Sequence, residues 1–141
     1  MTIRRIIEGR DTVLTCQVST TVREAAGILA EKRIGALPVL DGDTLAGMFS
    51  ERDVIYRLHE FGPDVLHRPV SEVMTAPPVT VTPDMSVLAA LALITRRRIR
   101  HLPVIEGERM VGLVSIGDLV KYRIEKVESE AAAMREYIQM A

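Results

Sequence analysis

Apolar residues recur at helical spacing in two stretches of the chain. The positions that follow the i, i+3, i+4, i+7 pattern are Val22, Ala25, Ala26 and Leu29 in the first stretch, and Val87, Ala90, Leu91 and Ile94 in the second. This spacing places the apolar side chains on one face of a helix. Thr21 and Ser86 immediately precede the two runs, where residues of these types cap helix N-termini. The pattern therefore predicts two amphipathic helices.

Each predicted helix is followed by two short apolar runs with an acidic residue and a glycine between them. The runs are "ALPVLDGDTLAGMFS" at 36–50 and "HLPVIEGERMVGLVS" at 101–115. Such a break between two apolar runs indicates a β-hairpin. A helical pattern resumes after each final serine, and an extended run, 12–18 or 77–83, precedes each first helix. The sequence thus predicts the order β-α-β-β-α twice.

The two copies align without a gap at an offset of 65 residues. Identical pairs outside the serine junctions include Ile34/Ile99, Leu37/Leu102, Pro38/Pro103, Val39/Val104 and Gly42/Gly107. An internal repeat of this length indicates duplication of one supersecondary unit. We predict an α+β fold (α/β-like in its mixture of elements) in which the repeats, 8–67 and 73–130, form a pseudo-twofold pair around one core. A helical extension is expected over 131–141.

Composition excludes several classes of protein. The 141 residues suit one compact domain, and 18 basic against 19 acidic side chains give a net charge of −1, which favours neither nucleic acid nor an anionic membrane. No apolar run approaches a membrane span, and the N-terminus lacks the apolar stretch of a signal peptide. We therefore expect a soluble, cytoplasmic protein. Cys16 is the single cysteine and is expected to be a small buried residue.

The two repeats share a polar signature where the second strand meets the second helix. Gly47, Ser50 and Asp53 recur as Gly112, Ser115 and Asp118. Serine at an N-cap with an acidic residue three positions later resembles a capping box, which would make both residues purely structural. The same helix N-terminus could hold a phosphate, and the carboxylate could accept hydrogen bonds from ribose hydroxyls. The residues alone leave both interpretations open.

Together, the element order, the "LPV" strands, the "DG" turn and the duplicated Gly-x-x-Ser-x-x-Asp junction resemble a tandem pair of CBS domains, also called a Bateman module. The resemblance covers about residues 8 to 125, and "FSERDVI" with "RHLPV" is similar to small stand-alone bacterial proteins of this family. It implies that AMP, ADP, ATP, S-adenosylmethionine or NAD(H) binds between the repeats and regulates a partner. It also implies that Asp118, and by symmetry Asp53, holds a ribose.

We expect the two clefts between the repeats to differ. We expect the main cleft to pair the second junction with the strand start of the first repeat, with Arg52 reaching a phosphate there. Its residues are Asp118, Ser115, Arg100, His101, Arg52, Ile34, Gly35, Ala36, Val13 and Leu14. A second cleft would be formed by Asp53, Ser50, Val79 and Thr80. An adenine nucleotide (AMP, ADP, ATP or NAD(H)) is the expected ligand.

Other chemistry has little support in the sequence. The histidines His59, His67 and His101 lack the spacing of metal ligands, and no nucleophile–base pair stands out, so we expect no metal, no catalytic cofactor and no enzyme activity. The basic run at 95–101 is expected to be a solvated helix face rather than a nucleic-acid site, since no reader motif accompanies it.

The last predicted helix carries a heptad seam. Its apolar positions, which step by 4, 3, 4, 3 and 4, are Val120, Ile124, Val127, Ala131, Met134 and Ile138. We expect a homodimer, through a disc-like CBS assembly and this helix; packing against its own domain is the alternative. The expected function is a stand-alone ligand-sensing module that regulates an unidentified protein. The alternative is a structural dimerisation unit with vestigial clefts.

Overall fold

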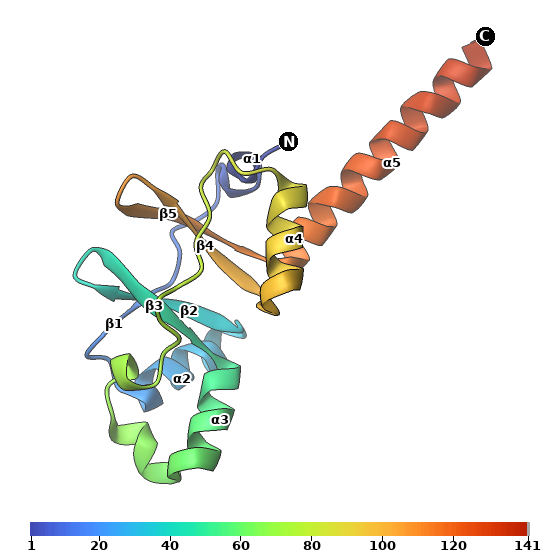
Figure 1. Cartoon of the computed structure of the whole chain (residues 1–141). Coiled ribbons are helices and arrows are strands. Elements are labelled where there is room, and N and C mark those ends of the chain that lie inside the picture. Colours follow the sequence, from blue (N-terminus) through green and yellow to red (C-terminus); the bar gives the residue numbers. More distant parts are fainter. Residues whose placement is uncertain (141) are drawn as a thin grey trace.

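A computed structural model describes residues 1–140, so the final residue of the extension expected over 131–141 lies outside the described residues. Figure 1 shows an α+β chain with two small sheets and a long C-terminal helix, as predicted. In the first half lie α1 (Ile3–Ile7), β1 (Cys16–Gln17), α2 (Val22–Lys32), β2 (Ala36–Asp41), β3 (Thr44–Ser50) and α3 (Glu51–Phe61). After the short 3₁₀ segments η1 (Pro63–His67) and η2 (Val70–Glu72) come α4 (Val87–Arg97), β4 (His101–Glu106), β5 (Arg109–Ser115) and α5 (Ile116–Met140).

The strand registers match between the two repeats. In repeat 1, β2 pairs antiparallel with β3, Pro38 opposite Met48; in repeat 2, β4 pairs antiparallel with β5, Pro103 opposite Leu113. Both hairpins have a register shift at the same place, after Val39 and after Val104. Equal registers and equal irregularities at an offset of 65 residues confirm that one supersecondary unit is written twice.

The first strand of the predicted unit is shorter than the sequence suggests. In repeat 1 it is the two-residue β1, which pairs parallel with β2 through Cys16 and Val39. In repeat 2 the corresponding pairing is a single bridge between Val81 and Val104. The extended runs therefore contribute only one or two residues to each sheet, and the rest of each run is free to cross between the repeats.

The hydrophobic core is divided between the repeats, whereas the sequence analysis expected one shared core. The repeat 1 cluster contains Val22, Leu37 and Phe49, and the repeat 2 cluster contains Val87, Leu102 and Val114. Each hairpin packs against the helices of its own repeat, and α1 also packs into the repeat 2 cluster. Cys16 is buried in the first cluster, as predicted, and burial raises the pKa of its thiol to about 11.

The N-terminal helix belongs to the second half of the molecule. Ile3 and Ile6 of α1 are buried in the repeat 2 cluster, and the backbone N–H of Ile3 donates to Met85 O at 3.0 Å. The segment between the repeats packs symmetrically on repeat 1, where the backbone N–H of Met48 donates to Thr75 O. The β2–β3 hairpin is thus flanked by the segment between the repeats, and the β4–β5 hairpin by the N-terminal segment. Residues of both segments line the clefts.

Helix α5 is much longer than its counterpart α3 and projects well beyond the rest of the fold (Figure 1). Leu119, in its first turn, is buried in the repeat 2 core. Within residues 1–140, no helix is both long enough and apolar enough to cross a membrane.

Candidate functional site

The two Ser-x-x-Asp junctions have the same local geometry. Asp53 Oδ2 accepts a hydrogen bond from the backbone N–H of Ser50 at 2.9 Å, and Ser50 Oγ accepts one from the N–H of Asp53 at 3.2 Å. The corresponding distances for Asp118 and Ser115 are 2.8 Å and 3.1 Å. Both junctions are therefore reciprocal capping boxes. The capping role predicted from the sequence is present in both copies, which leaves a ligand role to be decided by the other neighbours of each carboxylate.

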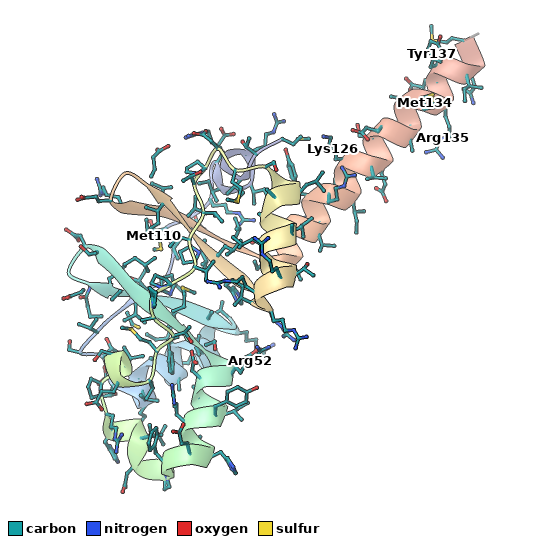
Figure 2. All side chains as sticks on the ribbon, in the orientation of Figure 1. Arg52, Met110, Lys126, Met134, Arg135 and Tyr137 are labelled. Carbon is teal, nitrogen blue, oxygen red and sulfur yellow. The ribbon has the colours of Figure 1, made fainter. Side chains whose placement is uncertain are left out.

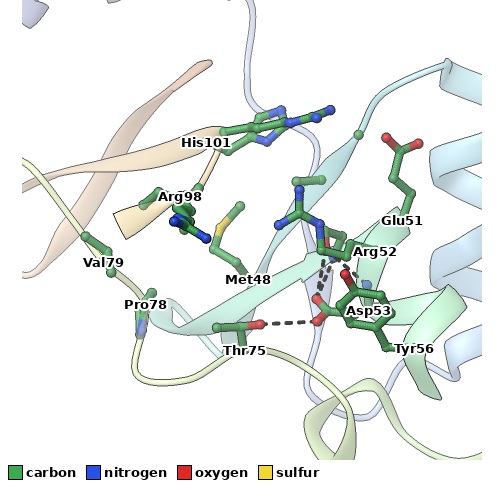
Figure 3. Close-up of a pocket in the computed structure, with 15 residues that line it drawn as sticks. Met48, Glu51, Arg52, Asp53, Tyr56, Thr75, Pro78, Val79, Arg98 and His101 are labelled. Carbon is green, nitrogen blue, oxygen red and sulfur yellow. Dashed lines mark hydrogen bonds between the residues drawn. The ribbon is translucent and has the colours of Figure 1, made fainter. Parts of the chain in front are cut away.

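Those neighbours differ. Asp53 Oδ1 accepts a hydrogen bond from Thr75 Oγ at 3.2 Å, as Figure 3 shows. At the corresponding position, 65 residues earlier, the chain has Arg10 instead of a threonine. The guanidinium of Arg10 lies 2.9 Å from Asp118 Oδ1 and 3.1 Å from Asp118 Oδ2, so it spans both carboxylate oxygens.

The ion pair changes what Asp118 can do. Burial acts to raise the pKa of Asp118, but hydrogen bonds from Arg10 and Ser115 and the charge of Arg10 together lower it below its usual value. A carboxylate that is forked by a guanidinium has few lone pairs left for another donor. Asp53, whose third neighbour is a neutral hydroxyl, remains open to a ligand.

A cavity of about 340 Å³ adjoins Asp53. Its walls come from the α3 N-terminus, the segment between the repeats, and the turn between α4 and β4, so both repeats contribute to it. The lining residues are Gly35, Ala36, Met48, Ser50, Glu51, Arg52, Asp53, Tyr56, Thr75, Pro78, Val79, Arg98, Ile99, Arg100 and His101. This volume falls within the range of small-molecule sites, about 300–1,000 Å³.

Charge and shape are unevenly distributed around this cavity. Three arginines, Arg52, Arg98 and Arg100, face two carboxylates there, and the N-terminus of α3 adds the positive end of a helix dipole. Met48, Val79 and Ile99 provide apolar surface. Figure 3 shows Arg52, Asp53 and Tyr56 on the α3 side, with Arg98 and His101 on the repeat 2 side. The arrangement suits a ligand that carries an anionic group and a flat apolar group.

His101 lies where the two repeats meet. Burial lowers the pKa of its imidazole, which the charges of Asp118 and Glu51 partly counteract. A Cβ atom added to Gly35 would lie 3.3 Å from His101 Cε1, so the lack of a side chain at Gly35 makes room for the ring. His101 therefore acts as a neutral group packed between the two junctions at neutral pH.

The structure groups the candidate residues differently from the sequence analysis. Five residues expected beside Asp118 line the cavity of Asp53; they are Arg52, Arg100, His101, Gly35 and Ala36. Arg52 and Asp53 share the first turn of α3, so Arg52 lines the cleft of its own junction and does not cross to the other one. Ser50 and Val79 line this cavity as expected, whereas Thr80 is exposed and does not.

The remaining candidates lie around Asp118 or outside the cavities. Val13 lines a second cavity, of about 600 Å³, together with Arg10 and Leu113. Asp118 and Ser115 line neither cavity, Leu14 is exposed, and Ile34 packs against the repeat 1 core. Contact of any of these residues with a nucleotide stays a prediction.

Sequence reasoning did not single out Thr75, Tyr56, Arg98 or Arg10. Arg98 ends α4 with a left-handed backbone (φ 54°), like Arg33 at the end of α2, and no helix-ending glycine marks either position. Arg10 and Thr75 could have been found by extending the 65-residue alignment upstream of the first helices. Among residues 1–140, no three His, Cys, Asp or Glu side chains are grouped so that they could hold a metal ion.

Comparison with known proteins gives matches over nearly the whole chain. The family described as "CBS domain" matches twice, at residues 3–60 and 70–125. The CBS domain-containing protein YhcV of Bacillus subtilis is 36% identical over 124 residues, which cover 84% of this chain and 86% of that protein. The chain spans only 64% of the mitochondrial CBS domain-containing protein CBSX3 of Arabidopsis thaliana and 20% of a mycobacterial inosine-5'-monophosphate dehydrogenase.

Solved structures match equally well. A putative signal-transduction protein with CBS domains from Burkholderia ambifaria is 39% identical, with a TM-score of 0.82, and the match covers 89% of this chain and 95% of that one. The structure of CBSX2 in complex with AMP is 25% identical, with a TM-score of 0.76, covering 88% and 96% of the two chains.

Proposed function

The chain belongs to the CBS-domain family, as a tandem pair, and on that premise we propose that it is a ligand-sensing regulatory module that binds an adenine nucleotide in the cleft of Asp53. AMP is the first candidate, and ADP, ATP and NAD(H) share the groups that the cleft would recognise. The observation that carries the proposal is the meeting, in one cavity shared by both repeats, of an open carboxylate, three arginines and an apolar wall.

Each part of a nucleotide has a counterpart in this cavity. Asp53 Oδ1 accepts only the hydrogen bond from Thr75, so the carboxylate has lone pairs left for the two ribose hydroxyls. The N-terminus of α3 and Arg52 suit a phosphate, because the positive end of the helix dipole and a guanidinium both favour a negative charge. Met48, Val79 and Ile99 offer the apolar surface for a base. The AMP bound by the related CBSX2 supports this class of ligand.

Sensing follows from where the cavity lies. Its walls come from α3 in repeat 1 and from the α4–β4 turn in repeat 2, so a ligand there would fix the two repeats relative to each other. A ligand shifts an equilibrium only by its differential affinity for the two states, which a site between two bodies can supply. A regulated protein would then bind the surface that changes. The alternative, a structural unit whose clefts bind nothing, predicts no ligand response.

The first test is titration calorimetry with AMP, beside ligand-free melting curves. Asp53→Asn should lower the affinity for AMP by about tenfold, because hydrogen bonds to charged groups contribute about 1.5–3 kcal/mol each and part of that survives in the amide. Its melting temperature without ligand should change little, since the asparagine carbonyl can still accept the hydrogen bond from the Ser50 N–H and only the charge in the first helical turn, worth about 0.3–1 kcal/mol, is lost.

Arg52→Ala is the matched variant for the phosphate. It should weaken AMP more than adenosine, since only AMP carries the group that the guanidinium would contact. Bound ligand at 100 times its Kd would add about 2.7 kcal/mol of stability, so a thermal-shift panel of AMP, ADP, ATP and NAD(H) is a sensitive screen. No response to any of them, or an Asp53→Asn variant that melts lower but binds AMP unchanged, would reject the proposal in favour of the structural alternative.

A further inference from the structure

One face of α5 is apolar and uncovered. The residues of the heptad seam, Val120, Ile124, Val127, Ala131, Met134 and Ile138, are all exposed, and the five larger side chains among them are between 41% and 65% exposed. The packing of α5 against its own domain, the alternative left open by the sequence, is limited to Leu119 and neighbouring side chains such as Tyr122. Figure 2 shows Met134 and Tyr137 on the part of the helix that projects beyond both repeats.

An isolated helix of this kind gains little stability from its own domain. Most helical stability in proteins comes from packing of an apolar face, which the projecting part of α5 lacks within this chain. Large exposed apolar surfaces on soluble proteins generally mark interaction sites. The steps of the seam alternate between 4 and 3 residues, which is the seven-residue repeat of helices that supercoil around each other. The seam thus has the spacing for a partner helix.

The charges beside the seam specify which helix and which direction. With Val120, Val127 and Met134 at d, and Ile124, Ala131 and Ile138 at a, the flanking g positions hold Arg123 and Glu130, and the e positions hold Glu128 and Arg135. In a parallel, in-register pair, each g residue faces the e residue five positions later on the other helix. Arg123 would face Glu128 of the second copy, and Glu130 would face Arg135 of the second copy, so both pairs join opposite charges.

An antiparallel pair would have the opposite character. There, e positions face e positions and g positions face g positions. Centred on the seam, this arrangement would set Glu128 against Glu128 and Glu130 against Glu130, and Lys121 against Arg135. All three contacts join like charges. The only ion pair that these flanking residues form within α5 is a long one, 3.8 Å, between Lys126 and Glu130, which leaves Glu130 available to a second helix.

We propose that residues 120–138 of α5 pair with the same helix of a second copy of the chain as a parallel, in-register, two-stranded coiled coil. The proposal does not depend on the nucleotide cleft, because none of the residues that line the cleft belongs to α5. It places the two CBS pairs of the dimer at the same end of one short rod. Because the seam spans fewer than three heptads, association should depend on concentration in the micromolar range.

The test is sedimentation equilibrium of the full chain. The wild type should form dimers through α5, and Val127→Asp should associate more weakly, with an unchanged melting transition of the repeats, since residue 127 contacts neither core. Glu128→Arg should weaken association by about tenfold, because two attractive contacts per dimer become repulsive. The double variant Arg123→Glu/Glu128→Arg should restore it. Glu136→Arg, on the outer face of the helix, is the control for charge reversal and should change nothing.

Direction is tested by cross-linking. Met134→Cys places a thiol at a d position, where a parallel pair brings the two copies together and an antiparallel pair keeps them apart. Mild oxidation should give a disulfide-linked dimer, and the buried Cys16, with its raised pKa, should not compete. The proposal is overturned by a wild type that stays monomeric at about 100 µM, by a Val127→Asp variant that associates as tightly as the wild type, by a trimer, or by absence of the cross-link.

Discussion

Removal of Arg10 should open the cleft of Asp118. In the wild type, the Arg10 guanidinium spans both oxygens of Asp118, at 2.9 Å and 3.1 Å, where Thr75 leaves Asp53 open. A ribose that approached Asp118 would have to displace this guanidinium. Arg10→Ala removes the obstacle and leaves the capping box of Ser115 and Asp118 in place. We therefore expect nucleotide binding at Asp118 to become stronger when Arg10 is lost.

The size of the effect follows from the exposure of the ion pair. Hydrogen bonds between charged groups are worth about 1.5–3 kcal/mol when buried, whereas exposed ion pairs contribute about 0–1 kcal/mol. The Arg10 and Asp118 side chains are 42% and 29% exposed, so solvent screens the pair, and its two-point geometry puts it near the upper end of the exposed range. A displacement cost of about 1 kcal/mol corresponds to about a fivefold change in Kd.

The assay is calorimetric titration of AMP in an Asp53→Asn background, which weakens binding in the Asp53 cleft so that binding in the Asp118 cleft can be resolved. Arg10→Ala should then raise the affinity about fivefold, and in the otherwise wild-type chain it should raise the stoichiometry from one toward two AMP per chain. Arg5→Ala, on the exposed face of α1, removes the same charge without touching Asp118 and serves as the control. A lower affinity after Arg10→Ala would mean that Arg10 binds the ligand, and an unchanged one that the ion pair obstructs nothing; both results refute the reasoning.

Two further predictions concern stability. A Cβ on Gly47 would lie 2.7 Å from Thr75 O, a backbone atom, so Gly47→Ala should destabilise the fold by roughly 1–3 kcal/mol in urea unfolding. Gly27 lies in a helix with open space around it, so Gly27→Ala should stabilise the fold by roughly 0.5–1 kcal/mol. Equal effects of the two substitutions would contradict the packing argument. Because burial lowers the pKa of His101, the contribution of the neutral imidazole to the free energy of unfolding is complete above its ordinary pKa, about 6.5. That contribution is lost as the pH falls through the pKa of His101 in the folded state. Unfolding measured from about pH 8 to pH 5 should therefore show a smaller loss for His101→Gln than for the wild type.

The element order and the repeat could be predicted because both are local. Helical spacing at Val22–Leu29, the acidic-glycine turn at Asp41 and the serine caps act over a few residues, and the structure follows them. The number of residues that pair in the first strand could not be predicted, because a run such as 77–83 has the pattern of an extended segment whether it pairs along its whole length or through Val81 alone. The pattern of apolar residues does not show how many backbone groups of the neighbouring strand are available for pairing.

The site was harder because its grouping depends on long-range placement. Of the Asp53 cavity, sequence reasoning found Ser50 and Asp53 but assigned Arg52, Arg100 and His101 to the other cleft. The assignment assumed that a residue beside one junction reaches across to the other, whereas the first turn of α3 points Arg52 into the cleft of its own carboxylate. The decisive asymmetry, Arg10 against Thr75, lies upstream of the region where the repeats are recognisably alike.

The position of α1 links the order in which the chain is synthesised to the state of the Asp118 cleft. The core of repeat 1 uses residues 16–73 and can close as soon as they have emerged from the ribosome, whereas that of repeat 2 needs Ile3 and Ile6 together with residues as late as Leu119. Residues that are made before repeat 1 are thus among the last to be buried. Arg10 follows Ile3 and Ile6 in the same N-terminal strap, residues 3–15. The step that completes the repeat 2 core therefore also brings the guanidinium to Asp118. A pull on the N-terminal strap would undo both at once, exposing two isoleucines and freeing one carboxylate.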